Sequence, residues 1–237
     1  MTKAVILAAG KGTRLKPVTN DIPKVMIPVN GKPVLEYHIE QLAKARIKKI
    51  FINLHHLPEK IKKYIGSGDR WNIEIIYSFE PEILGTAGAI KNIEKNIGPD
   101  PFLVVYGDNF LELDLSKFIK YSISKGGIGT IAVFEKDDVT GGGIVAIEKK
   151  NRITRFLEKP SPSEVFSHWV SAGVFFFSNR IFEFIGHGYS DLGYDILPKI
   201  LEQEDIIFAY KLDSKVWAID SIDLLNDLER HLKQRDI

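Results

Sequence analysis

The chain has 237 residues, no cysteine and a formal net charge of +1, with 44% hydrophobic and 27% charged residues. This balance is ordinary for a globular protein with a large core, and it gives no electrostatic reason to expect binding to nucleic acid or a membrane surface. The lack of cysteine excludes disulfides, thiolate metal sites and a cysteine nucleophile, and it fits a cytoplasmic protein. No apolar run approaches the roughly 20 residues that span a bilayer, and the N-terminus is typical of a core strand rather than a signal peptide.

The first half of the chain alternates between apolar, β-branched runs and segments with helical spacing. Strands are expected at residues 3–9, 50–54, 73–78 and 102–106. Helices are expected at residues 33–45, 59–65, 85–96 and 115–124. This order predicts an α/β fold with a mostly parallel, doubly wound (Rossmann-like) sheet and right-handed crossovers. Ligands of such a sheet bind at the carboxyl ends of its strands.

The second half contains closely spaced, strand-like runs with turns between them. Strands are expected at residues 128–134, 143–148, 153–156, 169–177, 206–210 and 215–219. Helices are expected at residues 179–185, 195–202 and 222–233, the last of them N-capped by Ser221. The close spacing predicts a small antiparallel extension that covers one side of the cleft.

A glycine-rich turn with cations follows the first strand, at residues 7–15. Glycine lets backbone N–H groups approach an anion closely, and Arg14 and Lys24 add mobile positive charge. The Walker pattern is absent, and Leu15 stands where the dinucleotide fingerprint needs its third glycine. Because Pro17 argues against a helix that starts at Gly12, we expect the loop to stay extended and to wrap around a triphosphate.

This loop and its continuation over residues 23–29 and 32–33 resemble the signature of the sugar-1-phosphate nucleotidyltransferases, also called nucleoside-diphosphate-sugar pyrophosphorylases. The resemblance extends over most of the chain. It implies a reaction of a nucleoside triphosphate with a sugar 1-phosphate that gives a nucleotide-diphosphate sugar and pyrophosphate, with Mg²⁺ as cofactor. The length matches the short form of the family, which lacks a β-helix domain.

No linker interrupts the chain, so one domain is predicted over residues 1–237. Its nucleotide half would cover about residues 1–125 and its sugar half about residues 126–237. In the loop, the residues assigned to the nucleotide are Leu7, Ala9, Gly10, Gly12 and Thr13. Arg14 matches the catalytic arginine of the family and would stabilise charge on the leaving pyrophosphate, and Lys24 would contact the α-phosphate or the sugar phosphate.

Two aspartates at strand ends are the expected metal ligands. Asp108 follows the apolar strand 102–106 and matches the Gly-Asp metal motif of the family. Asp220 matches the second metal aspartate, but the residues after it depart from the family pattern. Asp114 and Asp223 therefore remain alternatives to Asp220 in that role.

The turn that contains Gly85, Thr86 and Gly88 resembles the base-binding turn of the family. Glu80 stands where pyrimidine-specific members commonly have glutamine, and a carboxylate can accept both guanine N1–H and N2–H₂. Guanylyl transfer to mannose 1-phosphate or heptose 1-phosphate is therefore ranked first. Uridylyl or thymidylyl transfer to a hexose or amino-sugar 1-phosphate is the alternative.

The run Glu158-Lys159-Pro160 resembles the sugar-side motif of the family. It implies that Glu158 accepts sugar hydroxyls and that Lys159 pairs with the sugar phosphate. Ser171 and Gly173 fall in the family's Asn-Ala-Gly motif, where serine replaces asparagine, so the sugar stays open. A hypothesis from another class is a non-catalytic regulatory subunit that binds nucleotide sugars, which would be expected to lack Arg14, Lys24 or Asp108. The oligomeric state is also open, with a homo-oligomer among the alternatives.

Overall fold

The computed structural model of the chain describes residues 2–234. The strands are β1 (Lys3–Leu7), β2 (Pro28–Val29), β3 (Lys32–Pro33), β4 (Lys49–Leu54), β5 (Glu74–Phe79), β6 (Phe102–Tyr106), β7 (Asn109–Leu111), β8 (Gly129–Glu135), β9 (Gly143–Ile147), β10 (Arg152–Glu158), β11 (Trp169–Phe177), β12 (Ile207–Lys211) and β13 (Val216–Ala218). The helices are α1 (Val18–Asp21), α2 (Val34–Lys44), α3 (Pro58–Ile65), α4 (Gly85–Asn92), α5 (Glu94–Ile97), α6 (Leu115–Lys125), α7 (Leu197–Glu202) and α8 (Ile222–Lys233).

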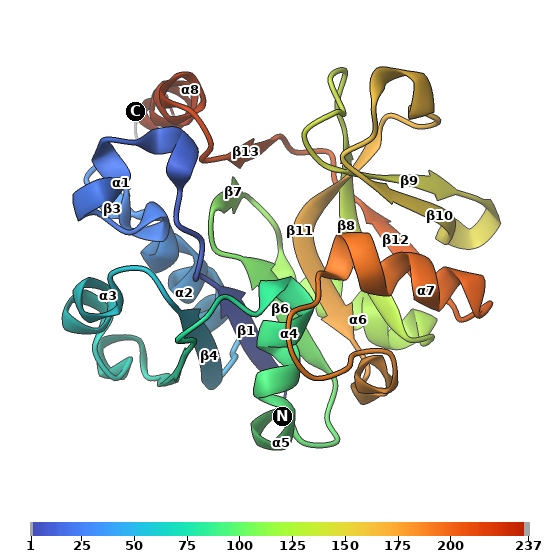
Figure 1. Cartoon of the computed structure of the whole chain (residues 1–237), viewed down its shortest axis with the longest axis horizontal. Coiled ribbons are helices and arrows are strands. Elements are labelled where there is room, and N and C mark those ends of the chain that lie inside the picture. The colour runs from blue at the N-terminus through green and yellow to red at the C-terminus, as the bar shows by residue number, and fades with distance from the viewer. Residues whose placement is uncertain (1, 235–237) are drawn as a thin grey trace.

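A nine-stranded sheet forms the centre of the molecule, in the order β5-β4-β1-β6-β11-β8-β12-β10-β9 (Figure 1). Strands β5, β4, β1 and β6 are parallel to one another, as the alternating first half predicts. Strand β11 is antiparallel to both β6 and β8. The parallel sheet is therefore confirmed, and the antiparallel extension continues the same sheet.

Helices cover both faces of this sheet. In β1, Ala4 and Ile6 pack in one cluster with residues of α2 and α6, whereas Val5 packs in a second cluster with residues of α4 and α7. The two clusters lie on opposite faces because successive side chains of a strand point in opposite directions. Figure 1 shows α4 and α7 on the near face and α2 and α6 behind the sheet.

The second half departs from the predicted strand pattern in two places. Strand β12 is parallel to β8, with Ile207 opposite Gly129. The connection through α7 starts from β11, which is antiparallel to β8, and it turns the chain back to the direction of β8. The expected strand 215–219 is not in the main sheet, since β13 pairs with β7 in a two-stranded sheet of its own. Figure 1 shows β13 leading to α8, whose Leu228 packs in one cluster with Leu15 and Ile27 of the first half.

Three expected helices differ from the prediction. The expected helix 85–96 divides into α4 and α5 at Ile93, whose N–H bonds the carbonyl of Ile90 in a tight turn. The segment 179–185 forms a 3₁₀ turn over Asn179–Glu183. The expected helix 195–202 contains α7, which is preceded by the wide turn Leu192–Ile196. No helix within residues 2–234 combines the length and the apolar character that a bilayer crossing requires.

His38 in α2 gives a pH-dependent stability. Its side chain is buried, and burial lowers its pKa to about 4, although contacts with Gly107 and Asn109 and the charge of Asp108 partly oppose the shift. The unfolded chain binds the proton near its ordinary pKa of about 6.5. The unfolded state therefore holds more protons between these two values, so stability present above pH 6.5 is lost as the pH falls toward 4.

The free energy of unfolding falls as the pH is lowered from 7 to 4.5. We expect this decrease to be about 2 kcal/mol smaller in His38→Gln than in the wild type. Urea denaturation of both proteins at several pH values measures this difference. A difference between the two proteins that does not change with pH would contradict the neutral, buried state of His38.

Candidate active site

Two cavities open at the carboxyl ends of the parallel strands. The larger has a volume of about 800 Å³ and the smaller about 240 Å³. Tyr106 at the end of β6 and Asp108 just after it line both of them. The two cavities therefore meet at the end of β6, where a doubly wound sheet is expected to bind its ligands.

The loop after β1 folds back on itself. Gly12 has a φ of +62°, and its carbonyl accepts hydrogen bonds from Leu15 N at 2.9 Å and from Thr19 Oγ1 at 2.8 Å. A 3₁₀ turn over Thr13–Leu15 and the short helix α1 follow. The expectation of an extended loop is therefore wrong, because the left-handed turn at Gly12 reverses the chain and the Thr19 hydroxyl holds it closed.

The cavities separate the predicted nucleotide-binding residues into two groups. Those that line the smaller cavity are Leu7, Ala9, Gly10, Glu80, Gly85 and Thr86. Those that line neither cavity are Gly12, Thr13 and Gly88. Thr13 is exposed to solvent, Gly12 packs against the side chains of Thr19 and Lys24, and Gly88 packs against the backbone of Gly188.

The two loop glycines can be distinguished by adding a single methyl group. A Cβ at Gly10 would meet no atom within 4 Å, whereas a Cβ at Gly12 would lie 2.8 Å from Thr19 Cγ2 and 3.1 Å from Lys24 Cβ. We expect Gly12→Ala to cost about 1–3 kcal/mol of stability. We expect Gly10→Ala to keep its stability but to raise KM for the nucleotide predicted from the sequence, because the methyl group would enter the smaller cavity. Denaturation and steady-state kinetics test both, and equal losses of stability would contradict this division.

Four charged side chains meet where the two cavities join. Lys24 Nζ lies 2.5 Å from Asp108 Oδ2 and 2.5 Å from Asp220 Oδ1. Arg14 Nη2 lies 2.9 Å from the same oxygen of Asp220. Burial favours a lower pKa of Lys24, but the two carboxylates outweigh it and raise that pKa. Burial favours a higher pKa of Asp220, but Lys24 and Arg14 outweigh it and lower that pKa.

The small β7–β13 sheet brings the two aspartates together. Ala218 pairs with Asn109, and the N–H of Ile219 donates to the carbonyl of Asp108 at 2.9 Å. Asp108 immediately precedes β7 and Asp220 is the second residue after β13, so antiparallel pairing places both carboxylates at one end of this sheet. The contact of Asp220 with Lys24 thus depends on a pairing between segments more than a hundred residues apart.

The two alternative aspartates occupy other places. Asp114 is the N-cap of α6, where its side chain accepts a hydrogen bond from Lys117 N at 3.0 Å. Asp223 is exposed in the first turn of α8, behind the N-cap Ser221. Neither lines the cavities, so the suggestion that one of them replaces Asp220 is wrong in geometry.

The residues at this junction fit a hard divalent cation. Asp108 and Asp220 offer only carboxylate oxygens, which are the ligands that Mg²⁺ prefers. Across residues 2–234, no group of three or more His, Cys, Asp or Glu side chains is placed to hold a metal ion. An ion here would therefore need further oxygens from phosphate or water, as is usual for Mg²⁺ in sites that bind nucleotides.

The carboxylate of Glu80, which the sequence assigned to the base, also makes structural hydrogen bonds. It is buried, and its Oε1 accepts from Asn53 Nδ2 at 2.8 Å while its Oε2 accepts from Leu84 N at 3.1 Å. Asn53 in turn accepts from the N–H of Ala8 at 2.6 Å. These bonds join β4, β5 and the loop after β1 under the smaller cavity. The sequence prediction missed Asn53, although a lone amide in the apolar run 50–54 was a usable signal.

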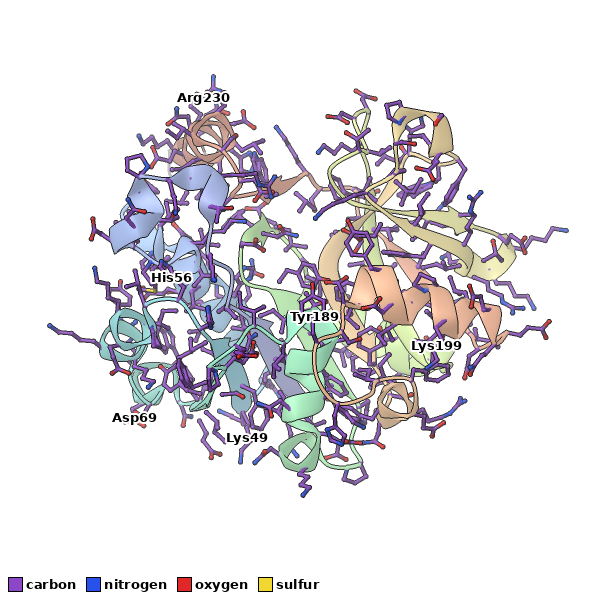
Figure 2. All side chains as sticks on the ribbon, viewed as in Figure 1. Lys49, His56, Asp69, Tyr189, Lys199 and Arg230 are labelled. Carbon is purple, nitrogen blue, oxygen red and sulfur yellow. The ribbon has the colours of Figure 1, made fainter. Side chains whose placement is uncertain are left out.

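The glycine turn at the start of α4 holds a neighbouring segment. The carbonyl of Ser190 accepts from Ala87 N at 2.9 Å and from Gly88 N at 3.1 Å. A Cβ at Gly88 would lie 2.3 Å from the carbonyl oxygen of Gly188. Gly88 is thus needed for close packing of segment 188–190, which carries Tyr189 in front of α4 (Figure 2).

Asp191, which the sequence analysis missed, lines the smaller cavity and bonds both to this turn and to Gly193 of the larger cavity. Its Oδ2 accepts from the Thr86 hydroxyl at 2.9 Å, and its Oδ1 accepts from Gly193 N at 2.8 Å and Tyr194 N at 3.1 Å. Thr86 also accepts from Leu192 N at 2.7 Å. A single Asp before a helix gives no sequence signal for such a contact, because most are ordinary caps.

All four predicted sugar-side residues line the larger cavity: Glu158, Lys159, Ser171 and Gly173. Burial raises the pKa of Glu158, and the nearby Lys159 opposes this only partly. The Glu158 carboxylate lies against the backbone of Gly193, where a Cβ would be 2.5 Å from Oε2. The Ser171 hydroxyl accepts from Gly173 N at 3.3 Å, so it turns back toward its own strand.

Two cations paired with two carboxylates, and two adjoining cavities at the end of a parallel sheet, are typical of an α/β protein of the nucleotide-binding type. The chain belongs to the nucleotidyl transferase family, whose model matches residues 3–220. The fold and the family predicted from the sequence are thereby confirmed.

Three similar proteins illustrate the range of named activities and ligands in this family. A UTP--glucose-1-phosphate uridylyltransferase of Synechocystis is 37% identical over 226 residues, which are 89% of this chain and 58% of the relative. A mannose-1-phosphate guanylyltransferase catalytic subunit beta of Drosophila pseudoobscura is 29% identical over 86% of this chain and 56% of the relative. HddC from Yersinia pseudotuberculosis, in its crystal structure complexed with GMP-PN, has 30% sequence identity to this chain. The two structures match with a TM-score of 0.82 over 98% of this chain and 100% of that one. The chain spans little more than half the length of the first two relatives.

Proposed function

We propose that this protein is a nucleotidyltransferase that converts a nucleoside triphosphate and a sugar 1-phosphate into a nucleotide-diphosphate sugar and pyrophosphate. The observation that carries the proposal is the meeting of Arg14, Lys24, Asp108 and Asp220 where the two cavities join. In this reading the smaller cavity takes the base and ribose, and the larger one takes the sugar. The α-phosphorus then lies between them, beside Asp108.

The side chains at the junction would act by holding charge and position, because phosphoryl chemistry needs little covalent help from a protein. Arg14, which is largely exposed at the cavity mouth, would neutralise the leaving pyrophosphate. Lys24 would bind the α-phosphate, and Lys159 would orient the phosphate of the sugar. Glu158 would accept sugar hydroxyls. When bound by Asp108 and Asp220, Mg²⁺ would supply the remaining neutralisation of phosphate charge.

For the base, we propose guanine, with mannose 1-phosphate or heptose 1-phosphate as the acceptor. Support comes from Glu80 in the smaller cavity and from the 30% identical HddC structure, which is a complex with GMP-PN. Uridylyl or thymidylyl transfer is the second candidate. It is favoured by the 37% identical uridylyltransferase and by the bonds that Asn53 and Leu84 already make to Glu80.

The test pairs each of four nucleoside triphosphates with several sugar 1-phosphates in the presence of Mg²⁺ and measures pyrophosphate release. It examines both the proposed reaction and the proposed choice of base and sugar. We expect release with at least one pair and the highest kcat/KM with GTP. Glu80→Gln should lower the preference for GTP over UTP. An unchanged preference would remove Glu80 from base selection, and no release with any pair would leave the regulatory-subunit hypothesis as the better one.

Three further expectations from the sequence stay predictions. They are the division near residue 125 into a nucleotide half and a sugar half, the cytoplasmic location, and a homo-oligomeric state.

A further inference from the structure

Lys24 occupies the position that a metal ion held by both aspartates would need. Its side chain is 8% exposed, and its Nζ lies 2.5 Å from one oxygen of Asp108 and 2.5 Å from one oxygen of Asp220. Its stem passes under Gly12, since a Cβ there would lie 3.1 Å from Lys24 Cβ. The ammonium group is therefore held between the two carboxylates by packing as well as by charge.

The charges at this junction already balance. Two carboxylates, Asp108 and Asp220, face two cations, Lys24 and Arg14. A divalent ion takes carboxylate oxygens at about 2.1 Å, so an ion bound to both would lie on or beside the present position of Nζ. Two cations at that range repel strongly in a half-buried site. A bare metal ion therefore meets a site that is both filled and neutral.

We propose that Lys24 is the resident counter-ion of the metal site, and that the site accepts a divalent cation only when a triphosphate draws Lys24 off the carboxylates. The anionic oxygens of the triphosphate provide the alternative partner that the ammonium needs. Metal and nucleotide then strengthen each other's binding by the same factor, as linkage requires. This inference rests on the proposed function in one respect, the identity of the anion that receives Lys24.

The first test uses Mn²⁺ alone, with free Mn²⁺ counted by electron paramagnetic resonance and no nucleotide present. We expect wild-type protein to bind Mn²⁺ weakly and Lys24→Met to bind it about tenfold more tightly or better, because one competing unit charge is gone. Arg14→Gln is the matched control. It removes the same charge from a side chain that is 68% exposed and pairs with Asp220, so the Mn²⁺ affinity of Arg14→Gln should rise much less.

The second test adds GTP or UTP without any sugar 1-phosphate, so no transfer occurs. Nucleotide should raise the Mn²⁺ affinity of wild-type protein strongly beyond that of the nucleotide itself, and should raise that of Lys24→Met far less. Equal Mn²⁺ affinity of wild type and Lys24→Met without nucleotide would overturn the proposal. If Mn²⁺ binds more tightly to Lys24→Met but no nucleotide has any effect, the counter-ion role stands, whereas the release of Lys24 by a triphosphate and the proposed function both fail.

Folding of Lys24→Met is checked by circular dichroism, because the variant leaves two carboxylates without their buried partner. If that variant does not fold, Lys24→Gln is used, and thermal unfolding of wild-type protein supplies an independent reading. Mn²⁺ alone should leave the Tm of the wild type nearly unchanged, and Mn²⁺ with a triphosphate should raise it more than the triphosphate does. A large rise with Mn²⁺ alone would contradict the inference.

Discussion

Asp108→Asn is expected to reduce metal-dependent turnover by about a thousandfold, the loss typical when preorganised charge is removed from a phosphoryl-transfer site. Asparagine keeps the size of the side chain but removes the negative charge. It therefore removes the ion pair with Lys24 at 2.5 Å and one of the two carboxylates available to a metal ion. Pyrophosphate release at saturating Mg²⁺ and substrates measures the effect on kcat.

Asp114→Asn is the matched control for this prediction. Asp114 belongs to the same segment but caps α6 and lies outside both cavities. We expect it to keep its turnover and to stay nearly as stable as the wild type, since asparagine also caps helices well. Comparable losses of turnover in the two variants would contradict the assignment of Asp108 to the reaction centre.

Gly88→Ala is expected to destabilise the protein by about 2 kcal/mol or more, although alanine is normally the better helix residue. The added methyl group would lie 2.3 Å from the carbonyl oxygen of Gly188, and a backbone atom cannot move aside as a flexible side chain can. Segment 188–192 must therefore shift. Because Asp191 lies in it and positions Gly193 beside Glu158, we also expect a higher KM for the sugar 1-phosphate.

Gly186→Ala offers the control from the same connection, because a Cβ there would meet no atom within 4 Å. Its stability and KM should stay close to those of the wild type. Urea denaturation and steady-state kinetics on both variants test the prediction. If Gly88→Ala were as stable as the wild type, segment 188–192 would adapt without cost and the close packing would not be required.

Much of the fold could be predicted because its signals are local. Apolar runs such as Phe102–Tyr106 give a buried strand wherever they pack, and their alternation with helical segments leaves a parallel sheet as the simplest arrangement. Asp108 could be placed at the site for the same reason, since the carboxyl ends of parallel strands meet at one edge. The family resemblance supplied the partners of Asp108 from positions far away in the chain.

Other parts could not be predicted because they depend on contacts between distant segments. The need for glycine at position 88 becomes visible only when Gly188 lies against it. The structural hydrogen bonds of Glu80 become visible only when Asn53 and Leu84 are placed beside it. The loop after β1 was expected to be extended, yet a hydrogen bond from Thr19 closes it. Each of these is a pairing that residue type alone does not specify.

The sequence by itself determined the alternation of strands and helices, the glycine-rich loop after β1 and the chemical character of the side chains around it. These follow from hydrophobic periodicity and from glycine and charge within a few residues of each other. Only the tertiary structure decided that Asp220 joins Asp108, and that Lys24 lies between them. That arrangement depends on the pairing of β13 with β7, whose register is set by backbone hydrogen bonds between segments that no local pattern connects.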